Sequence, residues 1–144
     1  MKIAIATDHG GYRYKEKIKA HLSACGYEVR DFGTHSEEAV DYPPIMRAAA
    51  QAVARGECAL GIVLGGSGNG EAIVANKVRG IRCGVCWCVD AARLAREHND
   101  ANMISIGQRL VPESEVLAIV DAWLTARFEG GRHARRIGQI ETAG

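Results

Sequence analysis

Residues 60–78, LGIVLGGSGNGEAIVANKV, decide the fold of this chain. An apolar run typical of a buried strand leads into a loop with four glycines, and a helix-like segment follows. A loop of this kind exposes backbone N–H groups where a helix begins, and such a nest can hold an anion or a developing oxyanion. Glu71 closes the loop with a carboxylate that phosphate binding does not require. An anion nest with a base beside it favours chemistry over simple binding.

Two common nucleotide-binding loops do not match this stretch. A dinucleotide fingerprint starting at Gly66 would need glycine where Glu71 stands, and it would follow the first strand of the fold, not the third. A phosphate-binding Walker A loop would need a Gly-Lys-Ser/Thr sequence, which is absent here. A tight turn with residues at positive φ remains the structural alternative. Four glycines together with Ser67 and Asn69 exceed what such a turn requires.

Strand-like and helix-like segments alternate along the whole chain. This order predicts one α/β domain over residues 1–144, a three-layer α/β/α Rossmann-like sandwich with a five-stranded parallel sheet. The expected strands are residues 2–7, 27–32, 59–64, 81–88 and 103–106, and the expected helices are 12–25, 45–55, 72–78, 91–97 and 112–128.

Composition excludes several classes of protein. The 144 residues carry a formal net charge of +1, which gives no general reason to expect a nucleic acid or a membrane surface as a partner. No segment approaches the ~20 apolar residues of a transmembrane helix, and the N-terminal apolar run is too short for a signal peptide. We therefore expect a cytoplasmic protein.

The five cysteines are an odd number, which argues against a disulfide framework. Cys83, Cys86 and Cys88 are close enough in sequence to suggest zinc. They lie in an expected strand, however, where alternate side chains point to opposite faces. Buried small hydrophobic residues are the favoured interpretation, and zinc is the alternative.

Polar residues follow three of the expected strands, and ligands of parallel α/β folds gather at the carboxyl ends of strands. Asp8 and His9 end the first strand, the glycine loop ends the third, and Arg109 follows the fifth. Asp8 could equally cap the helix that follows it. His98 precedes the fifth strand, and we expect it on the same rim, although a histidine at a helix end often only interacts with the helix dipole.

The chain ends in a basic segment. Arg132 and Arg136 are four residues apart and would share one helical face, with His133 nearby. Together with Arg109 they could bind a phosphate dianion through charge-assisted hydrogen bonds. A solvated basic tail is the alternative.

Taken together, these motifs resemble the ribose/galactose isomerase family, and within it the type B ribose-5-phosphate isomerases. The similarity runs in order from one end of the chain to the other. It rests on residues 6–11 (ATDHGG), 41–43 (DYP), 65–71 (GGSGNGE), 75–77 (ANK), 80–82 (GIR), 98–102 (HNDAN) and 128–136 (FEGGRHARR).

The resemblance implies an enzyme that interconverts ribose 5-phosphate and ribulose 5-phosphate without metal or cofactor. It also implies a homodimer or higher homo-oligomer with active sites shared between subunits, in which residues from about 130 to 144 contribute to the dimer and the phosphate site. One branch of the family uses a cysteine base at the position of Gly65, which this chain lacks. The chain therefore resembles the other branch, in which a glutamate at position 71 is the base.

Proton transfer between C2 and C1 through an enediolate needs a base, hydrogen-bond donors for the oxyanion, and side chains that bind the remote phosphate. We expect Glu71 to be the base, Ser67 to contact a reacting oxygen and His98 to open the furanose ring. The helix dipole would lower the pKa of Glu71 and a desolvated site would raise it, so the balance stays open. The remaining candidates, all for substrate binding, are Asp8, His9, Tyr42, Gly66, Gly68, Asn69, Gly70, Asn99, Arg109, Arg132, His133 and Arg136.

Two other functions remain open at this point. One is isomerisation of a six-carbon sugar phosphate, such as allose or galactose 6-phosphate. The other is a non-catalytic module that binds sugar phosphates on the same fold.

Overall fold

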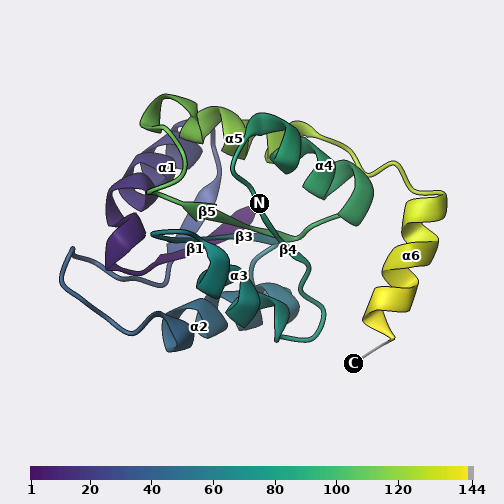
Figure 1. Ribbon diagram of the computed structural model, residues 1–144, viewed down its shortest axis with the longest axis horizontal. Coiled ribbons are helices and arrows are strands. Elements are labelled where there is room, and N and C mark those ends of the chain that lie inside the picture. Colours follow the sequence, from purple (N-terminus) through teal and green to yellow (C-terminus); the bar gives the residue numbers. More distant parts are fainter. Residues whose placement is uncertain (143–144) are drawn as a thin grey trace.

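A single parallel sheet organises the molecule (Figure 1). The computed structural model describes residues 1–142, and its five strands are ordered β2-β1-β3-β5-β4. Each pair of neighbours is parallel, as the alternating sequence predicts. The strands are β1 (Lys2–Thr7), β2 (Glu28–Asp31), β3 (Leu60–Gly65), β4 (Cys83–Val85) and β5 (Met103–Gly107).

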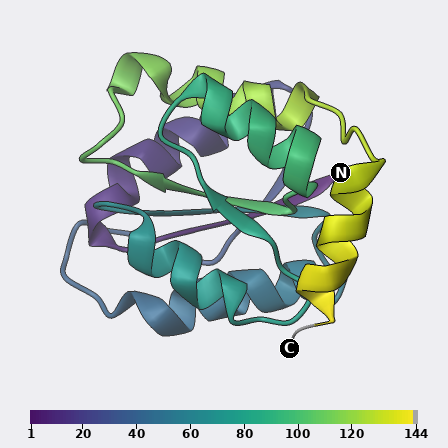
Figure 2. The ribbon, with the colours of Figure 1, turned by 45° about the vertical axis from the view of Figure 1, so that its right-hand side comes forward.

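Helices cover both faces of the sheet, so the expected three-layer sandwich is confirmed (Figures 1 and 2). Helices α1, α4 and α5 lie on one face, and α2 and α3 lie on the other. A short 3₁₀ turn, η1 (His9–Gly11), precedes the first of them. The helices are α1 (Tyr12–Ala24), α2 (Tyr42–Ala54), α3 (Asn69–Asn76), α4 (Val89–Asn99), α5 (Glu113–Thr125) and α6 (Arg132–Glu141).

The strands alternate their side chains between two hydrophobic cores, because successive residues of a strand face opposite sides. On β1, Ile3 and Ile5 pack under α1 and α5, whereas Ala4 and Ala6 pack against α2. Both faces of the central strands are buried, which explains the continuous apolar run of β3.

The cysteine-rich strand is shorter than expected. β4 spans Cys83–Val85 and lies at the edge of the sheet, where it pairs only with β5. Cys83 joins the core under α2 and α3, and Cys86 joins the opposite core, as strand alternation predicts. Burial raises the pKa of Cys86 to about 12, so its thiol stays protonated at neutral pH. In the part of the chain that the structure describes, the cysteines form no group of three metal ligands, which removes the zinc alternative there.

The basic tail is an ordered helix. α6 begins at Arg132 after the turn at Gly130 and Gly131, and it stands at one end of the sheet beside α4, away from both cores (Figures 1 and 2). Ala143 and Gly144, the last residues of the expected phosphate-binding tail, lie outside the described residues. Within residues 1–142, no helix is both long and apolar enough to cross a membrane.

Replacing Trp123 by Phe tests the packing of α5. Trp123 is fully buried, and its indole N–H donates to the Ala101 carbonyl at 2.9 Å. The Trp123→Phe variant removes this hydrogen bond and part of a fully buried ring, while Arg96 NH1 still donates to the same carbonyl at 3.1 Å. We therefore expect the free energy of unfolding to fall by about 1–3 kcal/mol. Urea denaturation at a fixed chain concentration measures the change.

Arg127→Lys is the control for this prediction, because Arg127 is exposed just after the end of α5. Its substitution should change the free energy of unfolding by less than about 0.5 kcal/mol. Equal effects of the two substitutions would contradict the structural role of Trp123.

Candidate active site

The glycine loop is held in place by the end of β5. Gly68, in the left-handed region at φ 83°, carries a carbonyl that accepts a hydrogen bond from Ser105 Oγ at 2.7 Å. The Ser67 backbone lies directly on Gly107, where a Cβ would overlap it. After β5 the chain returns over the loop, because the N–H groups of Gln108 and Arg109 donate to the carbonyls of Gly65 and Gly66 at 2.8 and 2.9 Å. Glycine is therefore required here for close backbone contact as well as for a turn.

Glu71 is a buried carboxylate in the first turn of α3. Its side chain is only 4% exposed, and its carboxyl group lies against the Cα of Gly65. A Cβ added at Gly65 would overlap that carboxyl group. Gly65 thus provides the space that the Glu71 carboxyl group occupies.

Burial decides the ionisation of Glu71. Desolvation raises the pKa of the Glu71 carboxyl, and the nearby charge of Asp8 raises it further. Backbone N–H groups at the start of α3 oppose this shift without reversing it. The sequence left open whether the helix dipole or burial has the larger effect on the pKa of Glu71. Burial has the larger effect, so the Glu71 carboxylate is a stronger base than an exposed one.

Asp8 and His9 lie at the end of β1, as expected. Asp8 Oδ1 accepts a hydrogen bond from the Gly10 N–H at 2.7 Å, so the capping alternative for Asp8 is correct. Asp8 also lines the cavity in front of the glycine loop, so it has a structural role and a place in the site. His9 is exposed, and its Nδ1 accepts from the Val40 N–H at 3.3 Å.

Tyr42 and Arg109 complete the walls of this cavity. Tyr42 begins α2, and its hydroxyl lies against the Cα of Gly70. The Arg109 guanidinium lies over Gly66, close enough that a Cβ there would be 3.3–3.4 Å from it. The cavity has a volume of about 340 Å³, and its lining residues are Asp8, His9, Gly10, Tyr42, Gly66, Ser67, Gly70, Glu71, Arg109 and Leu110.

The loop offers unpaired donors to this cavity. The N–H groups of Gly66 and Ser67 donate to no other backbone group in residues 1–142. The Ser67 hydroxyl accepts from the Asn69 N–H at 3.2 Å and is exposed. A buried carboxylate, free backbone donors and an arginine therefore meet at the carboxyl end of the sheet, where parallel α/β folds bind ligands.

A second group of expected site residues lies at the opposite end of the sheet. We expected His98 on the same rim as the glycine loop, and that placement is wrong. A helix that joins two parallel strands runs back antiparallel to them, so the C-terminal end of α4 lies where β5 begins. Figure 1 shows α6 at this end, with the loop between β3 and α3 at the other. The residues affected are His98, Asn99, Arg132, His133 and Arg136.

The second group is compact. The rings of His98 and His133 stack with their centroids 4.2 Å apart and an interplanar angle of 11°. His133 is buried, whereas Arg132 and Arg136 are exposed one helical turn apart. The three-arginine clamp that the sequence suggested does not form within one chain, because Arg109 belongs to the first group.

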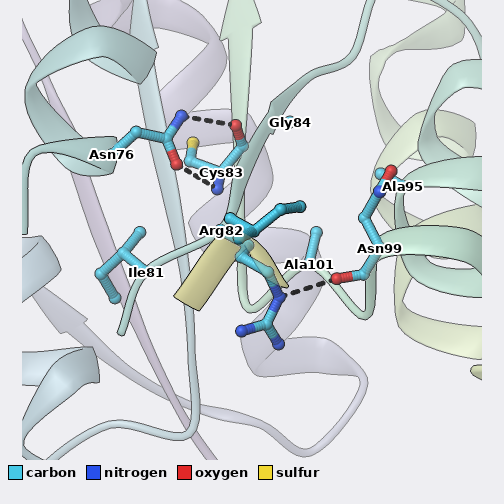
Figure 3. Close-up of a pocket in the computed structure, with 9 residues that line it drawn as sticks. Asn76, Ile81, Arg82, Cys83, Gly84, Ala95, Asn99 and Ala101 are labelled. Atoms are coloured by element: carbon cyan, nitrogen blue, oxygen red, sulfur yellow. Dashed lines mark hydrogen bonds between the residues drawn. The ribbon is translucent and has the colours of Figure 1, made fainter. Parts of the chain in front are cut away.

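Arg82 connects the two helices that carry the second group, α4 and α6, a role that its sequence motif did not predict. Its Nε donates to the Asn99 carbonyl at 2.8 Å, as Figure 3 shows, and its NH1 donates to Glu141 Oε1 at 2.6 Å. Arg82 therefore joins the end of α4 to the end of α6. It lines a cavity of about 320 Å³ with Asn76, Ile81, Cys83, Gly84, Ala95, Asn99, Ala101 and Ile140.

Fold and site together define a Rossmann-like α/β protein with a buried carboxylate at a glycine-rich anion nest. The family model described as Ribose/Galactose Isomerase matches residues 3–140, so the chain belongs to the ribose/galactose isomerase family. By this relationship it is an aldose–ketose isomerase.

Individual relatives agree with this assignment. The chain is 48% identical over 139 residues to ribose-5-phosphate isomerase B of Mycolicibacterium paratuberculosis, covering 95% of this chain and 87% of the relative. The solved ribose-5-phosphate isomerase B of Clostridium thermocellum superposes with a TM-score of 0.97 at 54% identity, covering 99% of this chain and 96% of that one. The Mycoplasma genitalium enzyme, solved with bound ribulose-5-phosphate, gives a TM-score of 0.94 at 39% identity, covering 98% and 94%.

Replacing Gly65 by Ala tests the contact between Gly65 and Glu71. Gly65 is not among the residues at positive φ, so the effect of the substitution is steric. The added methyl group displaces the Glu71 carboxyl, and we expect overpacking to cost about 1–3 kcal/mol of folding free energy and isomerase turnover to fall sharply. Turnover and urea denaturation measure the two effects.

Gly61→Ala is the control, because a Cβ at Gly61 would lie 2.9 Å from Met103 and 3.0 Å from Val53 in the core, and Gly61 does not line the cavity. It should also lower the free energy of unfolding by overpacking, but leave turnover near normal. Normal turnover in Gly65→Ala would contradict this account of the Glu71 site.

Proposed function

We propose that this chain interconverts ribose 5-phosphate and ribulose 5-phosphate, with Glu71 as the base that moves a proton between C2 and C1. The observation that carries the proposal is the buried Glu71 carboxyl, which lies against Gly65 beside free N–H donors. A base with a raised pKa is suited to accept a proton and then release it. The names of the relatives support the choice of substrate.

Proton transfer leaves an enediolate, whose negative charge needs donors already in place. Glu71 takes the C2 proton from the open-chain aldose, and the C1 carbonyl oxygen gains the charge. The proton of the C2 hydroxyl group passes to the C1 oxygen, and the Glu71 carboxylic acid then protonates C1 as the C2 oxygen becomes the ketone carbonyl. The N–H groups of Gly66 and Ser67 are unpaired at this edge of the cavity and supply such donors. Gly68, Asn69 and Gly70 shape the loop and the start of α3 that hold these groups.

The site is completed by a second copy of the chain. Among the described residues that line the cavity around Glu71, His9 is the one histidine, and its Nδ1 already accepts from the Val40 N–H. By contrast, a second group gathers at the opposite end of the same sheet: His98, Asn99, Arg132, His133 and Arg136. A two-fold dimer can bring the second group of one subunit to the first group of the other. In this dimer, the residues from 130 onward contribute both to the subunit interface and to the binding of the substrate phosphate.

The exposed apolar surface supports such an association. Ile73 on α3 and Trp87 after β4 are each 60% exposed. An open groove of about 720 Å³ runs between α3 and β4, lined by residues that include Ile73 and Val85. Apolar side chains beside a sheet edge are the kind of surface that a partner subunit buries.

Each remaining residue has a role in this proposal. His98 opens the furanose ring by acid–base catalysis, and Asp8 contacts the ring oxygen or a hydroxyl group. Arg132, His133 and Arg136 bind the phosphate through charge-assisted hydrogen bonds, with His9 and Arg109 facing them from the other subunit. Tyr42 and Asn99 contact sugar hydroxyl groups.

Glu71→Gln tests the assignment of the base. The amide keeps the shape of the side chain but cannot accept the proton, so we expect kcat to fall by about two to four orders of magnitude. Binding of ribose 5-phosphate, measured by calorimetry, should change little. Ketose formation from ribose 5-phosphate, with allose and galactose 6-phosphates as parallel substrates, gives the activity.

Glu28→Gln serves as the control, because Glu28 is exposed on β2 and remote from the cavity. Near-normal turnover in Glu71→Gln would refute the role of Glu71. Turnover of a hexose phosphate in preference to ribose 5-phosphate would refute the substrate.

The pH profile of kcat/KM tests the environment of Glu71. The base acts only when it is deprotonated, so activity falls as the pH drops through its pKa. Because burial and Asp8 raise that pKa, the acidic limb should lie at a higher pH than the ordinary glutamate pKa of 4.5. Asp8→Asn removes the charge of Asp8 and should move the limb toward lower pH. An acidic limb at or below 4.5 in the wild type would contradict the account.

A further inference from the structure

Glu129 faces the stacked histidine pair, and no role in the isomerisation uses it. Glu129 Oε1 lies 3.6 Å from His98 Nε2 and 3.4 Å from His133 Nε2. The ligand atoms of these three side chains all lie within 4.8 Å of one another. They come from the end of α4, the turn before α6 and the first turn of α6.

These separations suit a tetrahedral metal ion. Zinc binds histidine nitrogen and carboxylate oxygen at about 2.0–2.2 Å, which places two ligands of a tetrahedron about 3.3 Å apart. Both distances from Glu129 are close to this value. The two rings now stack nearly parallel, and a nitrogen binds a metal in the plane of its ring, so one imidazole must turn about its side-chain torsions for both nitrogens to reach a common ion.

Two imidazole nitrogens and one carboxylate oxygen decide which ions the site suits. Neutral imidazole is a ligand for zinc, nickel and copper, whereas magnesium and calcium prefer oxygen.

The backbone holds the three residues in position. The Glu129 N–H donates to the Glu97 carbonyl on α4 at 3.0 Å, and the His133 N–H donates to the Gly130 carbonyl at 3.1 Å. The nearby cations Arg132 and Arg136 weaken attraction for a divalent ion. The carboxylate of Glu129 therefore supplies the charge on which binding depends.

We propose that His98, His133 and Glu129 form a binding site for a divalent transition-metal ion of the zinc class, and that the bound ion inhibits the enzyme. Inhibition rests on the proposed function, in which His98 and His133 act on the substrate, because a metal takes up the nitrogens that they need. Metal binding itself does not depend on that function. A water molecule completes the coordination of the ion.

Glu129→Gln separates the metal site from the histidine pair. We expect zinc affinity, measured by calorimetry on the purified chain, to fall at least about tenfold in this variant. Cobalt provides the spectroscopic probe, because a tetrahedral site of nitrogen and oxygen gives visible absorption without a sulfur-to-cobalt band. Zinc should inhibit ketose formation over the same concentration range in which it binds, and higher concentrations should be needed in Glu129→Gln.

Glu115→Gln on α5 is the matched control, since Glu115 is exposed and is not one of the three ligands. Circular dichroism checks that each variant is folded. His133→Ala tests binding independently of Glu129.

Zinc binding unchanged in both Glu129→Gln and His133→Ala would overturn the site, as would a sulfur-to-cobalt band that assigns the metal to cysteine. Zinc bound at the site without inhibition of an active enzyme would overturn the inhibitory role. A chain that binds zinc as described but does not isomerise ribose 5-phosphate would refute the proposed function and leave the metal site standing.

Discussion

The direction of the crossover helices is the constraint on which the rest of the structure depends. Every strand of the sheet is parallel, so each connecting helix must run back to the starting edge. Groups that follow a strand, such as Glu71, therefore lie at one edge of the sheet. Groups that end a helix, such as His98, lie at the other. One chain cannot unite them, and a second copy of the chain is the simplest means of doing so.

The position of Glu71, the proposed base, follows from a contact between two residues. Gly65 ends β3 without a side chain, and the Glu71 carboxyl occupies the space next to it. The same contact removes water from the carboxyl group, which raises its pKa. The absence of a Cβ at Gly65 thus determines both where the Glu71 carboxyl lies and how strongly it binds a proton.

The sequence predicts most of the first half of the site, because its signals are local. β1 has the expected bounds, since an apolar run ends at the capping residue Asp8. The glycine loop follows β3 as expected. The start of α2 was placed too late, because two prolines fit the first turn of a helix and the helix already begins at Tyr42.

The position of the second group of residues could not be predicted from local sequence signals. His98 lies shortly before β5 in the sequence. This position alone does not show which edge of the sheet His98 occupies, because the edge depends on the direction of α4. The burial that sets the pKa of Glu71 and the stacking of His98 on His133 both depend on residues distant in sequence. The role of Arg82 is also tertiary, because its partners Asn99 and Glu141 lie on two different helices.

Complementation between two inactive variants tests the shared site most directly. Glu71→Gln and His98→Asn are each expected to be inactive, and they are unfolded together in equal amounts and refolded so that their subunits mix. Half of the dimers are then mixed, and each has one intact site, so about a quarter of the wild-type activity should return. A mixture of Glu71→Gln with Gly65→Ala, which damage the same half of the site, should recover none. Absence of activity in the first mixture, with mixed dimers verified by mass spectrometry, would contradict a site built from two subunits.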